Sequence, residues 1–209
     1  MSIIYRIVFY QGLNEMKTPS AGSKNEMLKQ KAEARETKRR QENAKKAKEA
    51  ADQLFPGEKW INKEVGIYLS PNRPIGKKTN YKDELKDAQI LRDLGNIVYL
   101  VSEIRSLPGK KYDAIVNEMM MEFKNMHGAS ARTLKDHFLD SREQAPNVFI
   151  NLEKSKLTKR EIMATLYAAR NSADYAKKNG FKSGRIILKI RGHTNLVYLN
   201  VDDLKVLRK

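Results

Sequence analysis

The sequence predicts an α/β fold, in which a mixed central sheet is flanked by helices and preceded by a basic N-terminal helix. The run at 96–103 is apolar almost throughout, as a central strand should be. The segment 158–179 has helical character, with a capping box at Thr158 and Glu161 and a stop at Gly180. Strand-like and helix-like segments also alternate along the chain, which is typical of α/β domains.

The first 57 residues are predicted to lie outside the compact domain. Ser2–Tyr10 is β-branched and aromatic, which favours a strand, and Gln11–Ser23 has the composition of a linker. Lys24–Leu54 favours a helix, but its apolar stripe is narrow, so it is either a solvated helix or partly disordered. Pro56-Gly57 ends it. The predicted parts are an N-terminal strand, linker and basic helix over 1–57 and a compact domain over 58–209.

The compact domain is expected to contain three single strands, three long helices and two hairpins. The helix that begins near Asn80 has this residue as its N-cap and Gly95 after its end. The residues 125–130 are expected to form a loop. In chain order, the predicted elements are a strand at Val65–Leu69, a helix at Asn80–Leu94, a strand at Asn96–Glu103, a hairpin at Lys111–Lys124, a helix at Ser130–Arg142, a strand at Asn147–Leu152, a helix at Thr158–Asn179, a hairpin of Arg185–Ile190 with Leu196–Asn200, and a short helix at Val201–Leu207.

The composition indicates a polyanionic partner. Lys and Arg total 41 against 25 Asp and Glu, a formal charge of +16, and the excess is found both before and after residue 57. The absence of cysteine excludes disulfides, thiolate metal sites and a cysteine nucleophile. No apolar run approaches the length of a membrane helix, so no membrane association is expected. The apolar start is broken by Arg6 and lacks the features of a signal peptide.

The hairpin at Lys111–Lys124 carries the most specific chemical signal. With a two-residue turn at Asn117-Glu118, Asp113 lies opposite Glu122, and Lys124 shares a face with Glu122. Opposed carboxylates destabilise a sheet unless something neutralises them, and a divalent cation would do so. Two acids and a lysine on one face therefore suggest a metal-dependent site that cleaves phosphodiesters. The alternative is an exposed hairpin end with solvated charges.

A second catalytic pattern is present on the next helix. Arg132 and His137 have the R-x4-H spacing of HEPN ribonucleases, in which the pair acts without a metal, although those proteins are all-helical. The histidines His127, His137 and His193 lack the spacing of zinc ligands. Loss in Arg132→Ala of an activity that persists in EDTA would support this metal-free alternative.

The hairpin and its neighbours also resemble a known family. Asp113 followed by Glu122-Phe123-Lys124 resembles the motif of the PD-(D/E)xK nuclease superfamily, with Tyr112 at the position of the proline. The runs ELKDAQILRDLGNIVYLVSEI, KKYDAIVNEMMMEFK and ASARTLKDHFLDSREQAPNVFINL are similar to the C-terminal tRNase toxin domains of contact-dependent growth inhibition (CdiA). They are also similar to toxin domains on phage head-morphogenesis proteins. The likeness covers residues 80–200 and implies a restriction-endonuclease-like core.

This resemblance implies roles for individual residues. It assigns Asp113, Glu122 and a helix carboxylate, Glu84, as metal ligands, with Asp87 as the alternative to Glu84. Catalysis would be by these three acids with Lys124. The metal would be Mg²⁺ or another divalent cation such as Mn²⁺ or Zn²⁺. Ser130, Thr133 and Gln144 match polar positions that support the site or the phosphate, and the basic residues around it suit a phosphate backbone. The substrate-binding set is therefore Ser130, Thr133, Gln144, Lys110 and Lys135.

The expected function is that of a metal-dependent endonuclease, a toxin domain acting on tRNA or other RNA in the cytoplasm of a target cell. A cognate immunity protein is the partner that the resemblance implies. Two alternatives remain: a DNA endonuclease of a mobile element, and a non-catalytic nucleic-acid-binding protein with a degenerate nuclease core. Cleavage that requires magnesium separates the first two from the third, and substrate choice separates the first from the second.

Overall fold

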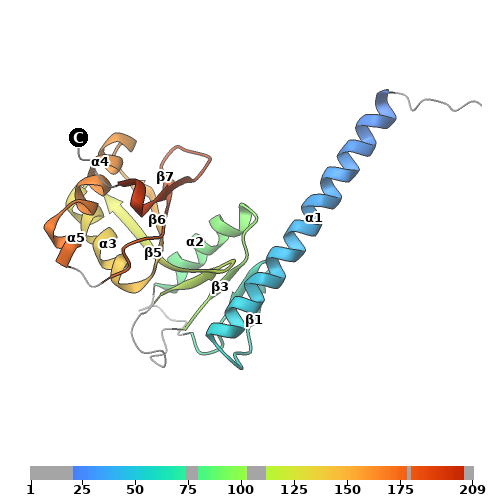
Figure 1. Ribbon diagram of the computed structural model, residues 1–209, viewed down its shortest axis with the longest axis horizontal. Coiled ribbons are helices and arrows are strands. Elements are labelled where there is room, and N and C mark those ends of the chain that lie inside the picture. Colours follow the sequence, from blue (N-terminus) through green and yellow to red (C-terminus); the bar gives the residue numbers. More distant parts are fainter. Residues whose placement is uncertain (1–20, 74–79, 103–111, 178–179, 205–209) are drawn as a thin grey trace, which may run out of the picture. The chain divides into compact units, whose positions relative to one another are not determined.

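The computed structural model describes residues 21–73, 80–102, 112–177 and 180–204 (Figure 1). Within these ranges it contains one eight-stranded sheet with the strand order β1-β2-β3-β4-β5-β6-β7-β8. The predicted strand at Ser2–Tyr10 lies outside the described residues. The strands are β1 (Ile61–Glu64), β2 (Ile67–Leu69), β3 (Val98–Leu100), β4 (Ala114–Val116), β5 (Met119–Gly128), β6 (Asn147–Ser155), β7 (Arg185–Ile190) and β8 (Val197–Asn200). The helices are α1 (Ala21–Leu54), α2 (Tyr81–Asp93), α3 (Ala131–Gln144), α4 (Lys159–Arg170), α5 (Ala173–Lys177) and the 3₁₀ turn η1 (Val201–Leu204).

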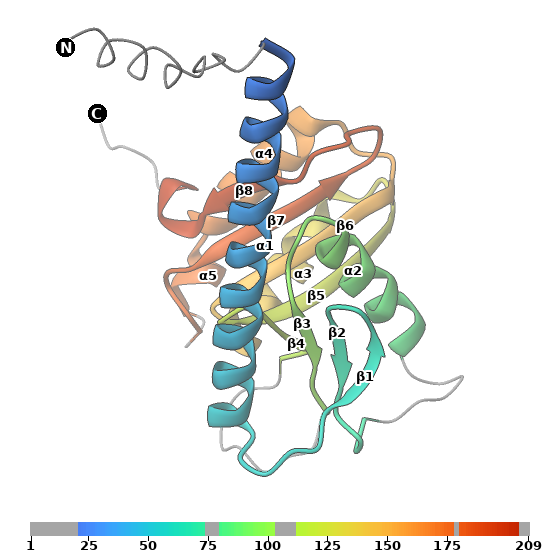
Figure 2. The ribbon, with the colours of Figure 1, turned by 90° about the vertical axis from the view of Figure 1, so that its right-hand side faces the viewer.

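The sheet is mixed, as predicted. The pairs β2–β3, β5–β6 and β6–β7 are parallel, and the remaining neighbours are antiparallel. Figure 2 shows the strands from β1 to β8 with helices on both faces of the sheet. The prediction of an α/β fold with a mixed sheet flanked by helices is therefore confirmed.

Alternate residues of the strands pack into separate cores on the two faces. On one face, α2 covers the middle of the sheet, where Leu91 packs with Val98 and Phe123. On the other face, α3 and α4 cover β5, β6 and β7. Because side chains alternate along a strand, β5 sends Phe123 towards α2 and its even-numbered neighbours towards α3. The chain thus places chemically different groups on the two sides of one strand.

The long helix α1 contributes only its last turns to a core. Ala47 and Ala51 are fully buried against Tyr99 and Ile115 on the sheet, whereas the helix is exposed from residue 25 to residue 42. The contacts accordingly divide the chain between Gln41 and Glu42, inside the helix. Small alanines let the helix backbone approach the sheet closely, while the charged majority of the helix remains solvated.

The hairpin of β4 and β5 has the predicted register. Val116 pairs with Met119, and Ala114 pairs with Met121. Asn117 takes a positive φ of 54° in the turn, a conformation that asparagine tolerates better than most residues. Its side chain accepts a hydrogen bond from Ile97 N at 3.0 Å and donates one to Asn96 Oδ1 at 2.9 Å. These bonds fix the turn against the start of β3.

Two strand predictions were incomplete. Ile61–Glu64 forms β1, a strand that was not predicted from the sequence. The predicted strand at Val65–Leu69 begins only at Ile67, because Val65-Gly66 forms the turn between β1 and β2. Gly66 has a φ of +83°, which a turn glycine supplies at low strain. The loop predicted at 125–130 was also wrong in part, since β5 continues to Gly128 through parallel pairing with β6. This extension lengthens the open edge of β5.

The helix predicted over Thr158–Asn179 was wrong as a single element. The capping box at Thr158 and Glu161 is present and starts α4, but the chain turns after Arg170 and resumes as α5. The side chain of Asn171 donates to Tyr167 O at 2.8 Å, and Ser172 Oγ accepts from Tyr175 N at 3.2 Å. Such local side-chain bonds compete with the helical ladder and end it.

Candidate functional site

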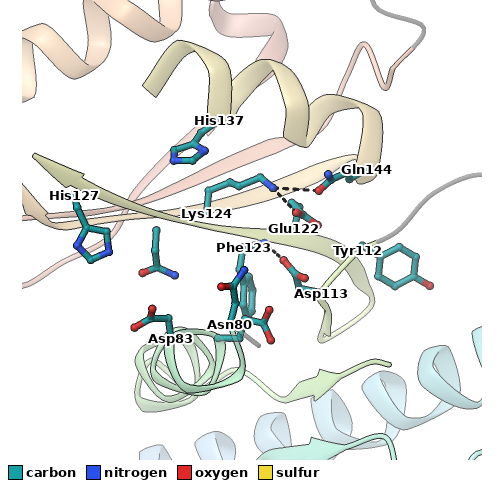
Figure 3. Close-up of a pocket in the computed structure, with 12 residues that line it drawn as sticks. Asn80, Asp83, Tyr112, Asp113, Glu122, Phe123, Lys124, His127, His137 and Gln144 are labelled. Atoms are coloured by element: carbon teal, nitrogen blue, oxygen red, sulfur yellow. Dashed lines mark hydrogen bonds and ion pairs between the residues drawn. The ribbon is translucent and has the colours of Figure 1, made fainter. Parts of the chain in front are cut away.

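A pocket opens where β5 runs past Ala114, the first residue of β4. Among the described residues, no strand pairs with this edge of β5 beyond Met121. β4 pairs with β5 only through Met119–Met121, whereas β6 pairs with β5 as far as Gly128. The cavity beside this edge measures about 460 Å³ and lies between α2 and α3 (Figure 3). Its lining is Asn80, Asp83, Glu84, Tyr112, Asp113, Glu122, Phe123, Lys124, Asn125, His127, His137 and Gln144. Four predicted catalytic residues, Glu84, Asp113, Glu122 and Lys124, are therefore brought together.

Asp113 and Glu122 form a buried pair of carboxyl groups. Asp113 Oδ2 accepts a hydrogen bond from Phe123 N at 2.8 Å, which fixes its side chain across the end of the hairpin. Burial is the main cause that raises the pKa of both groups, and that of Glu122 to about 8, with the Asp113 charge as a further cause. The two side chains also hydrogen-bond to each other. Near pH 7 these raised pKa values favour a protonated pair, in which Glu122 can donate to Asp113.

Lys124 is held on the α3 side of β5. Its Nζ donates to Glu122 Oε1 at 2.6 Å and to Gln144 Oε1 at 3.2 Å (Figure 3). Gln144 ends α3, so this helix sets the position of the ammonium group. The side chain of Lys124 is 18% exposed, against 6% for Glu122. The ammonium group is therefore open to the pocket while its carboxyl partner is buried.

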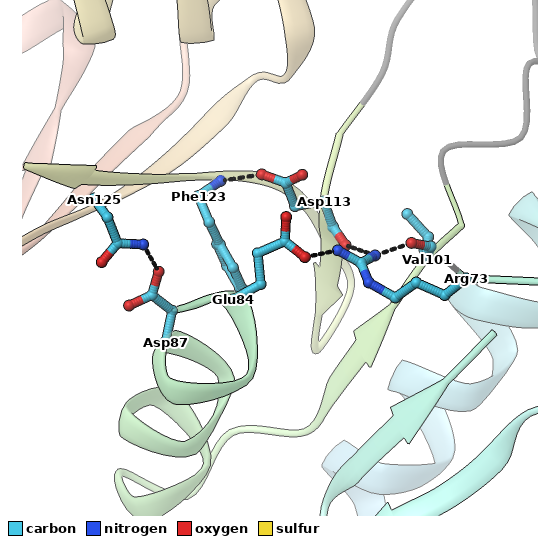
Figure 4. A network of polar contacts seen from close by, with 7 residues as sticks. All are labelled: Arg73, Glu84, Asp87, Val101, Asp113, Phe123 and Asn125. Atoms are coloured by element: carbon cyan, nitrogen blue, oxygen red, sulfur yellow. Dashed lines mark hydrogen bonds and ion pairs between the residues drawn. The ribbon is translucent and has the colours of Figure 1, made fainter. Parts of the chain in front are cut away.

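Glu84 lies in the pocket wall and forms an ion pair with Arg73, a residue that the sequence did not suggest as part of the site. Arg73 donates to Glu84 Oε2, to the carbonyl of Val101 and, at 3.2 Å, to the carbonyl of Asp113 (Figure 4). Both side chains are almost fully buried. Arg73 neutralises Glu84 and ties α2 to the ends of β3 and β4. No sequence pattern signals this pairing, because Arg73 and Glu84 come from a loop and a helix.

The alternative helix carboxylate, Asp87, points to a different place. It is fully buried, and its two oxygens accept from the side-chain amides of Asn125 at 2.5 Å and Asn151 at 2.7 Å. Burial raises the pKa of Asp87 to about 7, against the effect of these two bonds. Asp87 thus orients two amides of the sheet, a role that only the register of β5 and β6 reveals.

The donor set around Asp113 and Glu122 fits a divalent cation of the hard type. Carboxylate oxygens are the ligands that Mg²⁺ and Mn²⁺ prefer, and a bound cation would relieve the repulsion between the two carboxylates. Within the ranges that the structure describes, no three Asp, Glu or His side chains are grouped closely enough to enclose a metal ion. The third ligand suggested by the sequence, Glu84, is engaged by Arg73. Its metal role stays a prediction.

The predicted substrate-binding residues do not come together in the pocket. Gln144 lines the pocket, but Ser130 is the N-cap of α3 and accepts from Thr133 N at 3.1 Å. Ser130 and Gln144 are separated by the length of α3, about 20 Å. Lys135 does not line the pocket, and its Nζ pairs with Asp174 at 2.7 Å. Lys110 lies outside the described residues.

The arginine and histidine of the alternative pattern do not meet in the pocket. His137 lines it, half-buried, and burial lowers its pKa. Arg132 has a side chain that is 90% exposed and faces Asp136 one turn further along α3. Five residues on a helix place two side chains about 140° apart, since each residue turns the helix by about 100°. The spacing alone therefore does not assemble a metal-free pair.

Comparisons with known proteins give one structural similarity. No protein-family model matches the chain, and no curated protein matches it. Among solved structures, the chain is similar to a chain of the CdiA-CT/CdiI toxin and immunity complex from Burkholderia pseudomallei, with 20% sequence identity and a TM-score of 0.45. The alignment covers 63% of this chain and 97% of that chain. The similarity to that structure thus extends over most, but not all, of the sequence. In the part of the chain that the structure describes, no helix is long and apolar enough to cross a membrane.

Proposed function

We propose that this chain is a metal-dependent nuclease, a toxin domain that hydrolyses phosphodiester bonds in RNA. The supporting observation is the convergence of Asp113, Glu122 and Lys124 on one pocket edge, with Gln144 holding the lysine. The +16 charge of the chain favours a polyanionic substrate. RNA, the toxin role and a cognate immunity protein rest on the family resemblance of the motif-bearing segments.

Each residue of the pocket has a separate proposed role in hydrolysis. Asp113 and Glu122 are the proposed ligands of a divalent cation, which supplies charge neutralisation at the phosphate when it is bound. Lys124 offers its ammonium group to the attacking water or to a phosphate oxygen. Gln144 keeps that ammonium group in place from the end of α3. Arg73 holds Asp113 and Glu84 at a fixed spacing through the backbone and side-chain bonds described above.

Cleavage assays on total tRNA and plasmid DNA, side by side with Mg²⁺ or with EDTA, test this proposal. We expect cleavage of the tRNA that requires Mg²⁺ and that falls at least 100-fold in Asp113→Ala and Glu122→Ala. Lys159→Gln, an exposed change on α4, is the matched control and should keep full activity. Unchanged cleavage by either alanine variant with Mg²⁺ present would show that the site is wrong.

The same assay separates the alternatives. Cleavage of the plasmid but not of tRNA would favour a DNA endonuclease. Binding without cleavage under all conditions would favour a degenerate nuclease core. Activity that persists in EDTA and disappears in Arg132→Ala would favour the metal-free pair.

A further inference from the structure

A second pocket continues from the first along the open edge of β5. It measures about 330 Å³ and shares Asp83, Asn125 and His127 with the first pocket. Its other lining residues come from α2 and from β5 and β6: Lys86, Gln89, Ile90, Asp93, Met126, Asn151, Glu153 and Lys154. The two cavities are therefore neighbours along β5, so a base next to a phosphate held at Lys124 would lie close to the second cavity. The volume is within the usual range for a small-molecule site.

The wall chemistry of the second pocket differs from that of the first. It offers amide and carboxylate oxygens together with apolar surface from Ile90, and the lysines Lys86 and Lys154 belong to the same lining. Two of its carboxylates already have cationic partners: Asp93 accepts from Arg92 at 2.7 Å, and Glu153 lies 3.6 Å from Lys189. Hydrogen-bond acceptors beside an apolar wall suit the edge and the face of a nucleobase.

Buried Asp87 fixes the orientation of the two amides in this pocket. Asn125 and Asn151 each turn an NH₂ group towards Asp87, and its two oxygens accept from them. Asn151 Oδ1 then accepts from Glu153 N at 3.1 Å. The Oδ1 of Asn125 points away from Asp87 in Figure 4. Asn125, which belongs to the wall shared by both pockets, therefore presents an acceptor in a fixed direction.

We propose that the second pocket is a nucleobase subsite, which takes the base next to the cleaved phosphate and selects bases with an exocyclic amino group. Asn125 Oδ1 accepts a hydrogen bond from that amino group, and Ile90 contacts the face of the ring. Cytosine, with its amino group, is accepted better than uracil, which has a carbonyl oxygen at the same position. This subsite rests on the proposed function for the placement of the phosphate at Lys124.

Binding of mononucleotides to the full ¹⁵N-labelled chain tests the subsite without any cleavage. The probes are CMP, UMP and inorganic phosphate, and the readouts are the side-chain amide resonances of Asn125, Asn151 and Gln144 in NMR spectra. We expect CMP to shift the Asn125 and Asn151 amides with an apparent affinity at least threefold higher than that of UMP. Phosphate alone should shift only Gln144, which belongs to the first pocket. Equal shifts with CMP and UMP, or shifts confined to Gln144, would overturn the proposal.

Two variants localise the effect. Asn125→Ala should remove the preference for CMP over UMP, while the control Lys159→Gln should keep it. The comparison of CMP with UMP in the parent chain decides the proposal even if Asn125→Ala does not fold. Retention of the preference in folded Asn125→Ala, or its loss in Lys159→Gln, would contradict the assignment to Asn125.

The outcome for the subsite is separable from the outcome for the nuclease. If the chain cleaves RNA at Asp113 and Glu122 but CMP and UMP behave alike, the nuclease stands and the subsite falls. If CMP binds preferentially but no nucleic acid is cleaved, the subsite stands and the nuclease falls.

Discussion

The variant Glu122→Gln should stabilise the metal-free protein at neutral pH while it removes activity. In the folded protein, burial and Asp113 raise the pKa of Glu122 from 4.5 to about 8. The folded state therefore keeps a proton that the unfolded state loses. The sign follows: stability is greatest below about pH 4.5 and falls as the pH rises towards 8. A glutamine cannot ionise, and its NH₂ group can donate to Asp113 as the protonated carboxyl does.

The size of the effect follows from the two pKa values. Between pH 4.5 and pH 7, Glu122 ionises in the unfolded state but stays protonated in the folded state. The free energy of unfolding of the parent chain therefore falls by about 1.4 kcal/mol per pH unit, which gives about 3 kcal/mol at pH 7. For a chain of this length, 1 kcal/mol shifts Tm by about 2–4 °C, so the variant should melt roughly 6–12 °C higher.

Thermal unfolding followed by circular dichroism, in EDTA at pH 5, 7 and 8, measures the difference. The gap between Glu122→Gln and the parent chain should be small at pH 5 and should widen with pH. Glu49→Gln, at an exposed position of α1, is the control and should follow the parent at every pH. A variant that melts at or below the parent temperature at pH 8 would refute the reasoning about the buried pair.

Three further predictions concern the metal, the helix cap and the loop packing. Mg²⁺ should raise the Tm of the parent chain at pH 8 by several degrees, because it binds the folded state through Asp113. It should leave the Tm of Asp113→Asn unchanged. Equal Tm shifts in the two proteins would place the cation elsewhere. Ser130→Ala should lower the free energy of unfolding by about 1 kcal/mol, whereas Ser130→Asp should keep the helix cap and the stability. Loss of cleavage in a folded Ser130→Asp would instead support contact between Ser130 and the substrate. Gly184→Ala should lower the free energy of unfolding severely in urea titration, because its Cβ would lie 1.8 Å from Pro146 O. In Gly192→Ala the Cβ meets nothing within 4 Å, so the free energy of unfolding should fall by only about 1 kcal/mol. Similar losses of stability in the two variants would contradict the clash at Gly184.

Local sequence patterns predicted much of the sheet and one part of the site. The turn at Asn117 fixed the register of β4 and β5, and this register brings Asp113 and Glu122 together. The helix α2 also followed from its pattern, with Asn80 before it and Gly95 after it, although the side chain of Asn80 makes no capping bond. These features depend on neighbours within a few residues, which the sequence displays directly.

Features that depend on distant segments could not be predicted in the same way. β5 extends to Gly128 because β6 pairs with it, and β1 exists because Gly66 turns the chain back. Ser130 and Thr133 looked like pocket residues, yet they are at the far end of α3 from Gln144. The resemblance indicated polar types but not the face or the end of the helix on which they lie.

The sequence by itself determined the fold class, the hairpin and the pairing of Asp113, Glu122 and Lys124, because alternation along strands and a two-residue turn fix which side chains share a face. Only the tertiary structure decided that Arg73 neutralises Glu84 and that Asp87 orients Asn125 and Asn151. Those side chains come from a loop, a helix and two strands. Buried charges and amides must find partners once water is excluded, and the packing of α2 on the sheet determines which partners are in reach.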